Sequence, residues 1–356
     1  MKKLSVAVIA ILAVVVVAGS AVAVEAYYST APSSPCAALG TTSSGTQPAS
    51  GASAPATSGT GSARSTSSGT NGHDPADFTG VIQVVAAENF WGSLVSQLGG
   101  NHTSVLSIVT DPNADPHEYE ANSSDAIAIS NAQFVIVNGV GYDDWALQLI
   151  AAANTPNQVV LNVGILNGVS VTGNIVTGNP HMWYNPVYVN NTVAAMYSAL
   201  VSIEPSSTAY FQANYAALNV SLGQLYGQAA EIRNQFAGSV VASTESIFVY
   251  LANYTHLDLI SPPDFMKAIA EGNDPPAQSV VEFQCQLQSG TVAVLVYNEQ
   301  TVTPITSQMK VIAAQNNVTV VGVTETIQPP GVTFQVWMES QYLQLENALN
   351  AKALGQ

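Results

Sequence analysis

The chain contains three strand-like apolar runs that each end on a potential metal ligand: VLSIVTDPNADPH (105–117, ending at His117), VVASTE (240–245, ending at Glu245) and VTVVGVTE (318–325, ending at Glu325). A fourth candidate, His181, lies in the turn-rich segment NPHMWYNP. In open α/β sheets, ligands bind in the crevice outside the carboxyl ends of the strands. Two imidazoles and two carboxylates that meet there would form a cation site.

Further strand-like runs surround these three and alternate with helical patterns. The runs are almost continuously apolar, as expected of strands buried on both faces. Alternation of this kind predicts an α/β fold with mainly parallel sheets flanked by helices. The predicted strands are Val81–Ala87, Val105–Val109, Phe134–Asn138, Val159–Val163, Val240–Ser243, Val292–Tyr297 and Val318–Val323; helical patterns include Phe90–Leu98, Asp125–Ala132 and Thr306–Gln315.

One long helical pattern, Ser206–Phe236, interrupts the alternation. Its apolar residues, which run from Tyr210 to Ile232, recur every three or four positions and indicate one buried face. Pro205 and Gly238 stand at its two ends, where these residues are favoured. A helix of this length suits a rigid spine between two α/β lobes, although a surface helix would show the same pattern. We predict a signal peptide or membrane anchor (1–28), a disordered linker (29–72), an N-terminal lobe (73–204), a spine helix (205–237) and a C-terminal lobe (238–356).

The composition is acidic and poor in charge. The chain has 23 Asp and Glu against 7 Lys and Arg, and charged residues make up only 8% of it. Nucleic-acid binding needs a basic face, which this balance does not supply. The acidic field instead favours cations as a general background effect.

The first 72 residues predict export rather than a folded domain. Lys2 and Lys3 precede the uncharged apolar run Leu4–Val24, which is long enough to span a bilayer. Ala21-Val22-Ala23 resembles a signal-peptide cleavage site, so the run is either an anchor or a cleaved export signal. The Ser/Thr/Gly/Ala/Pro-rich segment that follows cannot bury enough surface to fold and is read as a tether. Both readings place the folded region outside the cytoplasm, secreted or anchored at the cell surface.

The glycosylation sequons agree with an extracytoplasmic location, and the cysteines are neutral on this point. The folded region contains six Asn-x-Ser/Thr sequons, which are compatible with a glycoprotein; they begin at Asn101, Asn122, Asn190, Asn219, Asn253 and Asn317. The two cysteines, Cys36 and Cys285, do not indicate a disulfide framework; a bridge between them stays open as an alternative but is disfavoured.

Five motifs now follow one another in an order that is typical of a known family: AAENFWGSL (86–94), DPNADPHEYEANSSDAIAISNAQFVIVNGVGYDDW (111–145), NPHMWYNP (179–186), STESIFVYLANY (243–254) and VGVTETIQPPG (321–331). From about Val81 to its end, the chain resembles the metal-binding (zinc/manganese) solute-binding proteins of ABC importers, cluster A-I. That family includes the periplasmic zinc-binding and streptococcal manganese-binding lipoproteins.

The resemblance implies that His117, His181, Glu245 and Glu325 occupy the four metal-ligand positions. It implies a non-enzymatic, extracytoplasmic subunit, expected to be monomeric, that hands one divalent ion to a membrane permease with its cytoplasmic ATPase. Two features depart from the zinc-specific members: Glu stands at both the third and fourth positions, and Asn162–Asn179 lacks His and acidic residues.

The donor set itself restricts the metal. Imidazole suits Zn²⁺, Fe²⁺ and Mn²⁺, and two carboxylates neutralise a divalent charge and so reduce the cost of burying it. Zinc binds such a set more tightly than manganese, whereas bidentate carboxylates would accommodate manganese. We therefore expect zinc first and manganese second, with Fe²⁺ as a further option.

Each candidate ligand also has an ordinary structural interpretation. His117 and His181 could belong to plain turns, and Glu245 and Glu325 could be helix N-caps or exposed carboxylates. Glu88, Asn89 and Trp183 are candidates for residues that orient or enclose the ligands, although a helix start or packing explains them equally well.

Two other functions remain open from the sequence. A zinc hydrolase is disfavoured because the chain has no HExxH motif and no evident nucleophile with a base. A metal-dependent surface adhesin or structural protein is compatible with the tether and the sequons.

Overall fold

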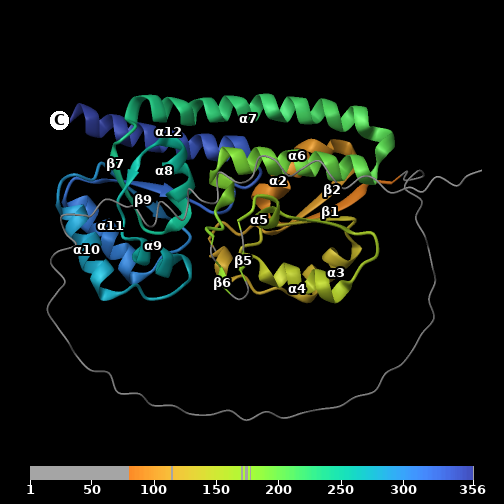
Figure 1. The fold of residues 1–356 in the computed structure, drawn as a ribbon, viewed down its shortest axis with the longest axis horizontal. Coiled ribbons are helices and arrows are strands. Elements are labelled where there is room, and N and C mark those ends of the chain that lie inside the picture. The colour runs from red at the N-terminus through yellow and green to blue at the C-terminus, as the bar shows by residue number, and fades with distance from the viewer. Residues whose placement is uncertain (1–79, 114, 170, 173–174, 177, 356) are drawn as a thin grey trace, which may run out of the picture.

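The computed structural model describes residues 80–355 except 114, 170, 173–174 and 177. It has two α/β lobes that lie side by side, and one long helix, α7, runs along both of them (Figure 1). The predicted membrane segment and the linker lie outside the described residues. Among the described residues, no helix is long and apolar enough to cross a membrane.

The N-terminal lobe is built on a four-stranded sheet in which every pairing is parallel. Its strand order is β2-β1-β3-β4. The strands are β1 (Ile82–Glu88), β2 (Thr103–Val109), β3 (Phe134–Val137) and β4 (Val159–Asn162); the helices are α2 (Asn89–Gly99), α3 (Ser123–Asn131), α4 (Asp144–Ala153), α5 (Val163–Leu166) and α6 (Pro186–Ile203). A small antiparallel pair, β5 (Val171–Thr172) and β6 (Ile175–Val176), follows α5.

The C-terminal lobe repeats this topology. Its parallel sheet has the order β10-β9-β7-β8, so its first strand again lies between its second and its third. The strands are β7 (Val240–Ser243), β8 (Asp258–Leu259), β9 (Val294–Asn298) and β10 (Thr319–Val323); the helices are α8 (Val249–Thr255), α9 (Pro263–Ala270), α10 (Ala277–Gln288), α11 (Pro304–Gln315) and α12 (Phe334–Leu354). The predicted two-lobe α/β fold is therefore confirmed.

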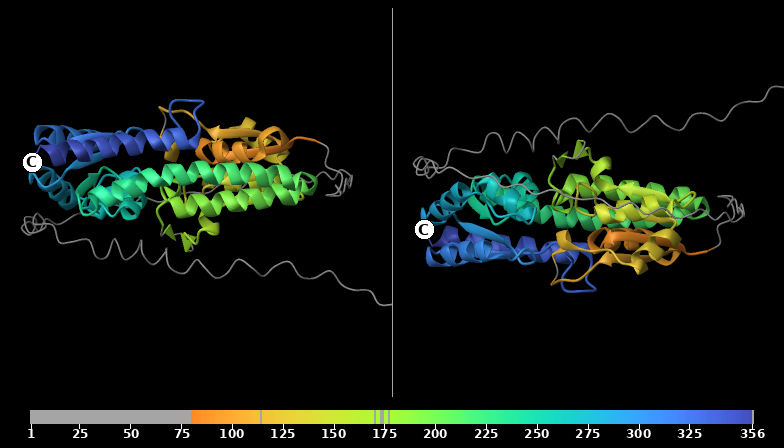
Figure 2. Two further views of the ribbon diagram at one scale, coloured as in Figure 1. Left: turned by 90° about the horizontal axis from the view of Figure 1, so that it is seen from above. Right: turned by 90° about the horizontal axis from the view of Figure 1, so that it is seen from below.

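The spine helix α7 (Thr208–Phe236) contacts both lobes. It packs against α2 and α6 on one side of the molecule and against α8 and α12 on the other, and Figure 2 shows α12 beside it. Its 29 residues span roughly 44 Å at 1.5 Å per residue. The buried face differs from the predicted one at its start, because Phe211 is buried while Tyr210 is exposed. The residue limits of the five segments predicted from the sequence stay predictions.

Apolar packing also joins the lobes directly. The Phe90 ring of α2 stacks on Trp183 with ring centroids 4.1 Å apart, and Trp337 of α12 stacks near it at 6.5 Å. All three side chains are buried in one core cluster that includes strands of both sheets. This packing joins the two sheets through one shared core cluster.

One expectation about the cysteines is wrong. Cys285, in α10, is disulfide-bonded rather than free. The only other cysteine of the chain, Cys36, lies outside the described residues. Sequence spacing could not indicate a bridge, because bridging depends on the distance between the two Cα atoms in the folded chain.

Candidate metal centre

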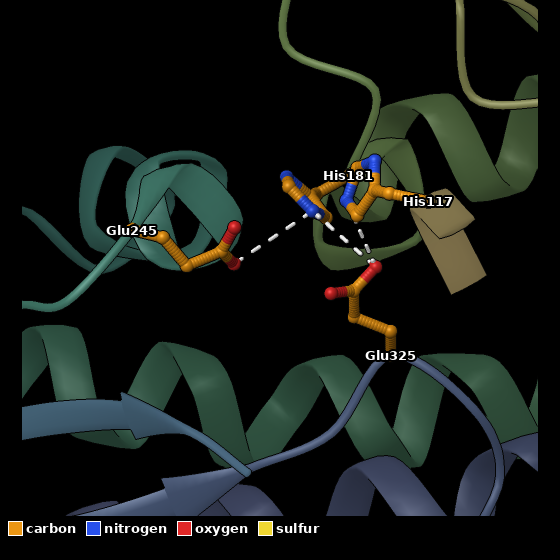
Figure 3. A group of neighbouring side chains, drawn as sticks. All are labelled: His117, His181, Glu245 and Glu325. Atoms are coloured by element: carbon orange, nitrogen blue, oxygen red, sulfur yellow. Dashed lines mark ion pairs between the residues drawn. The ribbon is translucent and has the colours of Figure 1, made fainter. Parts of the chain in front are cut away.

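Four side chains from distant parts of the chain meet between the lobes. His117, His181, Glu245 and Glu325 each offer a donor atom, and these atoms all lie within 4.8 Å of one another (Figure 3). The N-terminal lobe supplies the two imidazoles and the C-terminal lobe supplies the two carboxylates. No predicted ligand is left out of the group, and its role in holding a metal stays a prediction.

Strand ends and short turns place these four residues. Three of them follow the carboxyl ends of β2, β7 and β10. His117 lies in a single 3-10 turn, Pro116–Glu118, whose start is capped by the Asp115 side chain at 2.9 Å from the His117 backbone nitrogen. Glu245 precedes a similar turn, Ser246–Phe248, and Glu325 lies two residues beyond the end of β10. His181 precedes the turn Met182–Tyr184.

The donor atoms are close but do not satisfy one another. His117 Nε2 lies 3.2 Å from Glu325 Oε2, and His181 Nε2 lies 3.7 Å from that same oxygen and from Glu245 Oε1. These approaches are short enough for charge attraction but lack hydrogen-bond geometry. Both Nε2 atoms and Glu245 Oε2 are buried and have no hydrogen-bond partner among the described residues.

Burial makes these unpartnered atoms costly. The side chains of His181, Glu245 and Glu325 are completely buried, and that of His117 is 18% exposed. A buried polar atom without a partner costs free energy, and native structures rarely retain one without a reason. A divalent cation would satisfy all of these atoms at once. Of the four side chains, that of His117 alone has surface exposed to solvent.

A hydrogen bond fixes the tautomer of His181. Its Nδ1 lies 2.7 Å from Asn179 Oδ1, so Nδ1 carries the proton and Nε2 presents a lone pair to the centre. The Asn179 amide nitrogen donates in turn to the Ser246 carbonyl at 2.6 Å, which orients the amide and joins the lobes. The sequence interpretation missed Asn179; its position two residues before His181 was the available signal.

Three polar side chains hold Glu325 in place. The Tyr142 hydroxyl donates to Oε2 at 2.7 Å, while Asn298 Nδ2 and the Thr301 hydroxyl donate to Oε1 at 2.6 and 3.2 Å. Asn298 Nδ2 also lies 3.2 Å from Glu245 Oε1, which accepts a backbone hydrogen bond from Ile247 at 3.0 Å. The N-cap interpretation is thus correct for one oxygen of Glu245. Tyr142, Asn298 and Thr301 were not identified from the sequence.

Burial and neighbouring charges shift the pKa values of the four residues in different directions. Burial lowers the pKa of His117, but the adjacent Glu325 carboxylate outweighs it and raises that pKa to about 9. Burial alone would raise the pKa of Glu325, yet His117 holds it well below its usual range. Burial and the Glu325 charge raise the pKa of Glu245 well above its ordinary value, and burial lowers that of His181. This combination favours a His117–Glu325 ion pair, while the raised pKa of Glu245 makes it hold a proton more readily than a free carboxyl group does.

The three further candidates lie around the centre in different ways. Trp183 packs its ring 5.2 Å from that of His181 and encloses the site. Asn89 accepts a hydrogen bond at 3.0 Å from the backbone of Ile327, two residues beyond Glu325. Glu88 is fully buried, and both burial and the Asp143 charge raise its pKa well above the usual range. Among these, Asn89 acts on the segment that carries a ligand, and Glu88 faces Asp143 rather than an imidazole.

Asp143 stabilises the turn that carries Tyr142. Its carboxylate accepts hydrogen bonds from the backbone nitrogens of Asn138 at 2.6 Å and Gly139 at 2.7 Å, and burial raises its pKa to about 6. We expect Asp143→Ala to lower the free energy of unfolding by about 2–5 kcal/mol, because it leaves two buried N–H groups without acceptors. Urea denaturation of the metal-free protein at pH 7 measures the loss.

The neighbouring Asp144 provides the control for this substitution. Asp144 is exposed and makes no comparable buried contact among the described residues, so Asp144→Ala should change the stability by only about 0.5 kcal/mol. Equal effects of the two substitutions would contradict the assigned role of Asp143.

Comparison with known proteins places the chain among metal-binding proteins. The family profile described as "zinc-uptake complex component A periplasmic" (ZnuA) matches residues 84–348. A manganese-binding lipoprotein, MntA, of Halalkalibacterium halodurans is 28% identical over 144 residues, or 40% of this chain and 47% of that protein. A putative metal-binding protein of Treponema pallidum is 23% identical over 223 residues, or 57% of this chain and 67% of that protein. The chain thus spans about half to two thirds of the length of these curated relatives.

Solved structures support the same fold. The crystal structure of ZnuA superposes with a TM-score of 0.62 at 20% identity, covering 76% of this chain and 99% of that one. The periplasmic zinc-binding protein TroA from Treponema pallidum gives a TM-score of 0.65 at 15% identity, with the same coverage of both chains. At these identities the likeness shows the two-lobe architecture alone.

Proposed function

The chain belongs to the zinc-uptake complex component A family, and from that premise we propose that it is the extracytoplasmic substrate-binding subunit of an ABC importer. In this role it captures one divalent transition-metal ion between its two lobes and delivers the ion to a membrane permease. Relatives named as manganese-binding, iron-binding and ABC-transporter substrate-binding lipoproteins support the proposal.

The arrangement of the four donors is the observation that carries this proposal. Two imidazole nitrogens and two carboxylates converge from separate lobes, and three of their donor atoms are buried without a partner. Two formal negative charges compensate a divalent cation, which lowers the cost of burying it. A catalytic zinc keeps an open position for water, whereas four protein donors fill a tetrahedral ion. The centre therefore fits capture of an ion better than hydrolysis.

The permease, the membrane and the metal itself follow from the same proposal. Zinc is the first choice and manganese the second, because zinc binds a nitrogen–oxygen set more tightly. The ion enters at the exposed edge of His117 and displaces its proton. The permease and its ATPase are the partners, the protein acts as a monomer, and the N-terminal segment is proposed to attach it to the membrane or to direct its export.

Metal content and thermal stability test this function. We expect the purified protein to retain one zinc ion per chain after dialysis, as measured by elemental analysis. At free zinc about 1,000 times above the dissociation constant, binding should stabilise the fold by about 4 kcal/mol, which raises Tm by about 10 °C in a chain of this size. His256→Asn, which changes a histidine far from the centre, should behave as wild type. Absence of bound zinc, manganese and iron, together with an unchanged Tm, would refute the proposal.

A further inference from the structure

We infer that Asn298 and Thr301 determine the metal specificity of this centre by restricting each glutamate to one metal-binding oxygen. The restriction produces a four-coordinate site, which suits zinc and disfavours manganese. The inference rests on the proposed function, because it concerns which ion the same four ligands select.

Glu325 has almost no free acceptor capacity. An ionised carboxylate offers about four lone-pair positions, two on each oxygen. Asn298 and Thr301 occupy both positions of Oε1 at 2.6 and 3.2 Å. Tyr142 occupies one position of Oε2 at 2.7 Å. The remaining position belongs to Oε2, the oxygen that faces the Nε2 atoms of both histidines. Glu325 can therefore bind an ion through Oε2 alone.

One oxygen of Glu245, Oε1, is likewise occupied by hydrogen-bond donors. Its Oε1 accepts from the Ile247 backbone nitrogen at 3.0 Å and from Asn298 Nδ2 at 3.2 Å. Oε1 lies 3.7 Å from His181 Nε2, but these two donors already use its lone pairs. Oε2 is buried and has no hydrogen-bond partner among the described residues. The available metal donor of Glu245 is thus Oε2.

Asn298 Nδ2 has two hydrogens and lies near three acceptors, Glu325 Oε1 at 2.6 Å, Thr301 Oγ1 at 3.0 Å and Glu245 Oε1 at 3.2 Å. With one hydrogen directed to each Oε1, it restricts both carboxylates. Asn298 is the last residue of β9, which lies between β7 and β10, the strands that lead to Glu245 and Glu325. Its side chain is fully buried, and its Oδ1 accepts a hydrogen bond from the Gln300 backbone at 3.0 Å. That bond assigns the amide nitrogen to the side of the carboxylates.

The donor count then favours one class of ion. Two imidazole nitrogens and two single oxygens total four donors, the usual number for zinc in proteins. Manganese prefers octahedral oxygen-rich surroundings and would need bidentate carboxylates or added water. Bidentate binding is prevented because both Oε1 atoms already accept hydrogen bonds. Added water is limited because three of the four ligands are completely buried. The preference for zinc should therefore exceed the one that donor chemistry alone provides.

Substitutions at the two positions test the inference through a ratio of affinities. Thr301→Val frees one position on Glu325 Oε1, and Asn298→Ala frees one position on Oε1 of each glutamate. Zinc and manganese dissociation constants, measured by competition with a chelating indicator, should show the zinc-to-manganese preference falling about tenfold in the double variant. X-ray absorption should give four light ligands around zinc in the wild type and a higher number around manganese in the double variant.

Two controls separate specificity from general disruption. Tyr142→Phe frees a position on Oε2, which already faces the metal, so it should weaken both metals alike and leave their ratio unchanged. Thr255→Val removes a buried hydroxyl that bonds only to helix carbonyls in the structure, and it should change neither affinity.

The outcomes distinguish this inference from the function on which it rests. An unchanged ratio in the double variant, with tight zinc binding in the wild type, would overturn the inference and leave the proposed function intact. A bidentate glutamate around zinc in the wild-type absorption spectrum would overturn it even if the variants failed to fold. Failure of the wild type to bind either metal would refute both.

Discussion

Replacement of Glu325 by glutamine should lower the affinity for zinc by two to three orders of magnitude. Glu325 Oε2 lies 3.2 Å from His117 Nε2 and 3.7 Å from His181 Nε2, and its charge compensates the incoming ion in a fully buried position. Removing one partner of a buried charge pair costs about 3–5 kcal/mol, and each 1.4 kcal/mol is a factor of ten in affinity. Glutamine retains the size of the side chain, so the substitution removes charge without opening a cavity.

Competition titration against a chelator of known affinity measures this loss. Glu339→Gln serves as the matched control, because Glu339 is an exposed residue of α12 that does not belong to the donor group. It should leave zinc affinity within about twofold of the wild type. A Glu325→Gln protein that bound zinc as tightly as Glu339→Gln would remove Glu325 from the ligand set.

Zinc affinity should fall steeply as the pH is lowered. The metal-free protein holds a proton on His117 below about pH 9, the pKa to which Glu325 raises it. Since a ligand nitrogen must be deprotonated to bind, zinc must displace this proton. The apparent dissociation constant should therefore increase about tenfold for each pH unit below 9, or about 100-fold between pH 8 and pH 6. The proton on Glu245, whose pKa is also raised, steepens the dependence further.

Calorimetry in buffers of different ionisation enthalpy provides the direct measurement. At pH 7 we expect His117 to release about one proton per zinc ion bound, because its pKa of about 9 keeps it protonated there. The pH dependence of the stability of the metal-free protein is an independent test of the raised His117 pKa. A histidine whose pKa is raised on folding stabilises the folded state fully below its ordinary value near 6.5, and this contribution is lost as the pH rises through about 9. Zinc affinity that did not vary between pH 6 and 9 would contradict the assigned His117–Glu325 pair.

The two expectations have a common physical basis. In the metal-free centre, protonated His117 neutralises the Glu325 charge, and the raised pKa of Glu245 favours its neutral form. A divalent ion that displaced one proton from each of His117 and Glu245 would leave the total charge of the group unchanged. Burial of the centre is therefore compatible with both states, and the competition between protons and metal sets the affinity.

The strands were predictable because their signal is local. A continuous apolar run that ends in a turn indicates a buried parallel strand without reference to the rest of the chain. The predicted run Val240–Ser243 coincides with β7, and Val159–Val163 exceeds β4 by one residue. The two candidate carboxylates were found for the same reason, since each lies two residues beyond such a run.

The residues that orient the ligands could not be found in this way. Tyr142 and Glu325 are 183 residues apart, and Asn298 lies 53 residues from Glu245 and 27 from Glu325. No spacing in the sequence distinguishes Tyr142 or Asn298 from other tyrosines and asparagines at the ends of strands. The hydrogen bonds of Asn179 across the two lobes were hidden for the same reason.

The amino-acid sequence by itself determined the alternation of strands and helices and the two-lobe class, because apolar runs are properties of neighbouring residues. It also yielded the four candidate donors, through the residues that follow those runs and the order of the family motifs. Only the tertiary structure decided which oxygen of each glutamate faces the imidazoles and which residue carries a proton. Those properties depend on burial and on hydrogen bonds between segments that become neighbours only when the two sheets pack together.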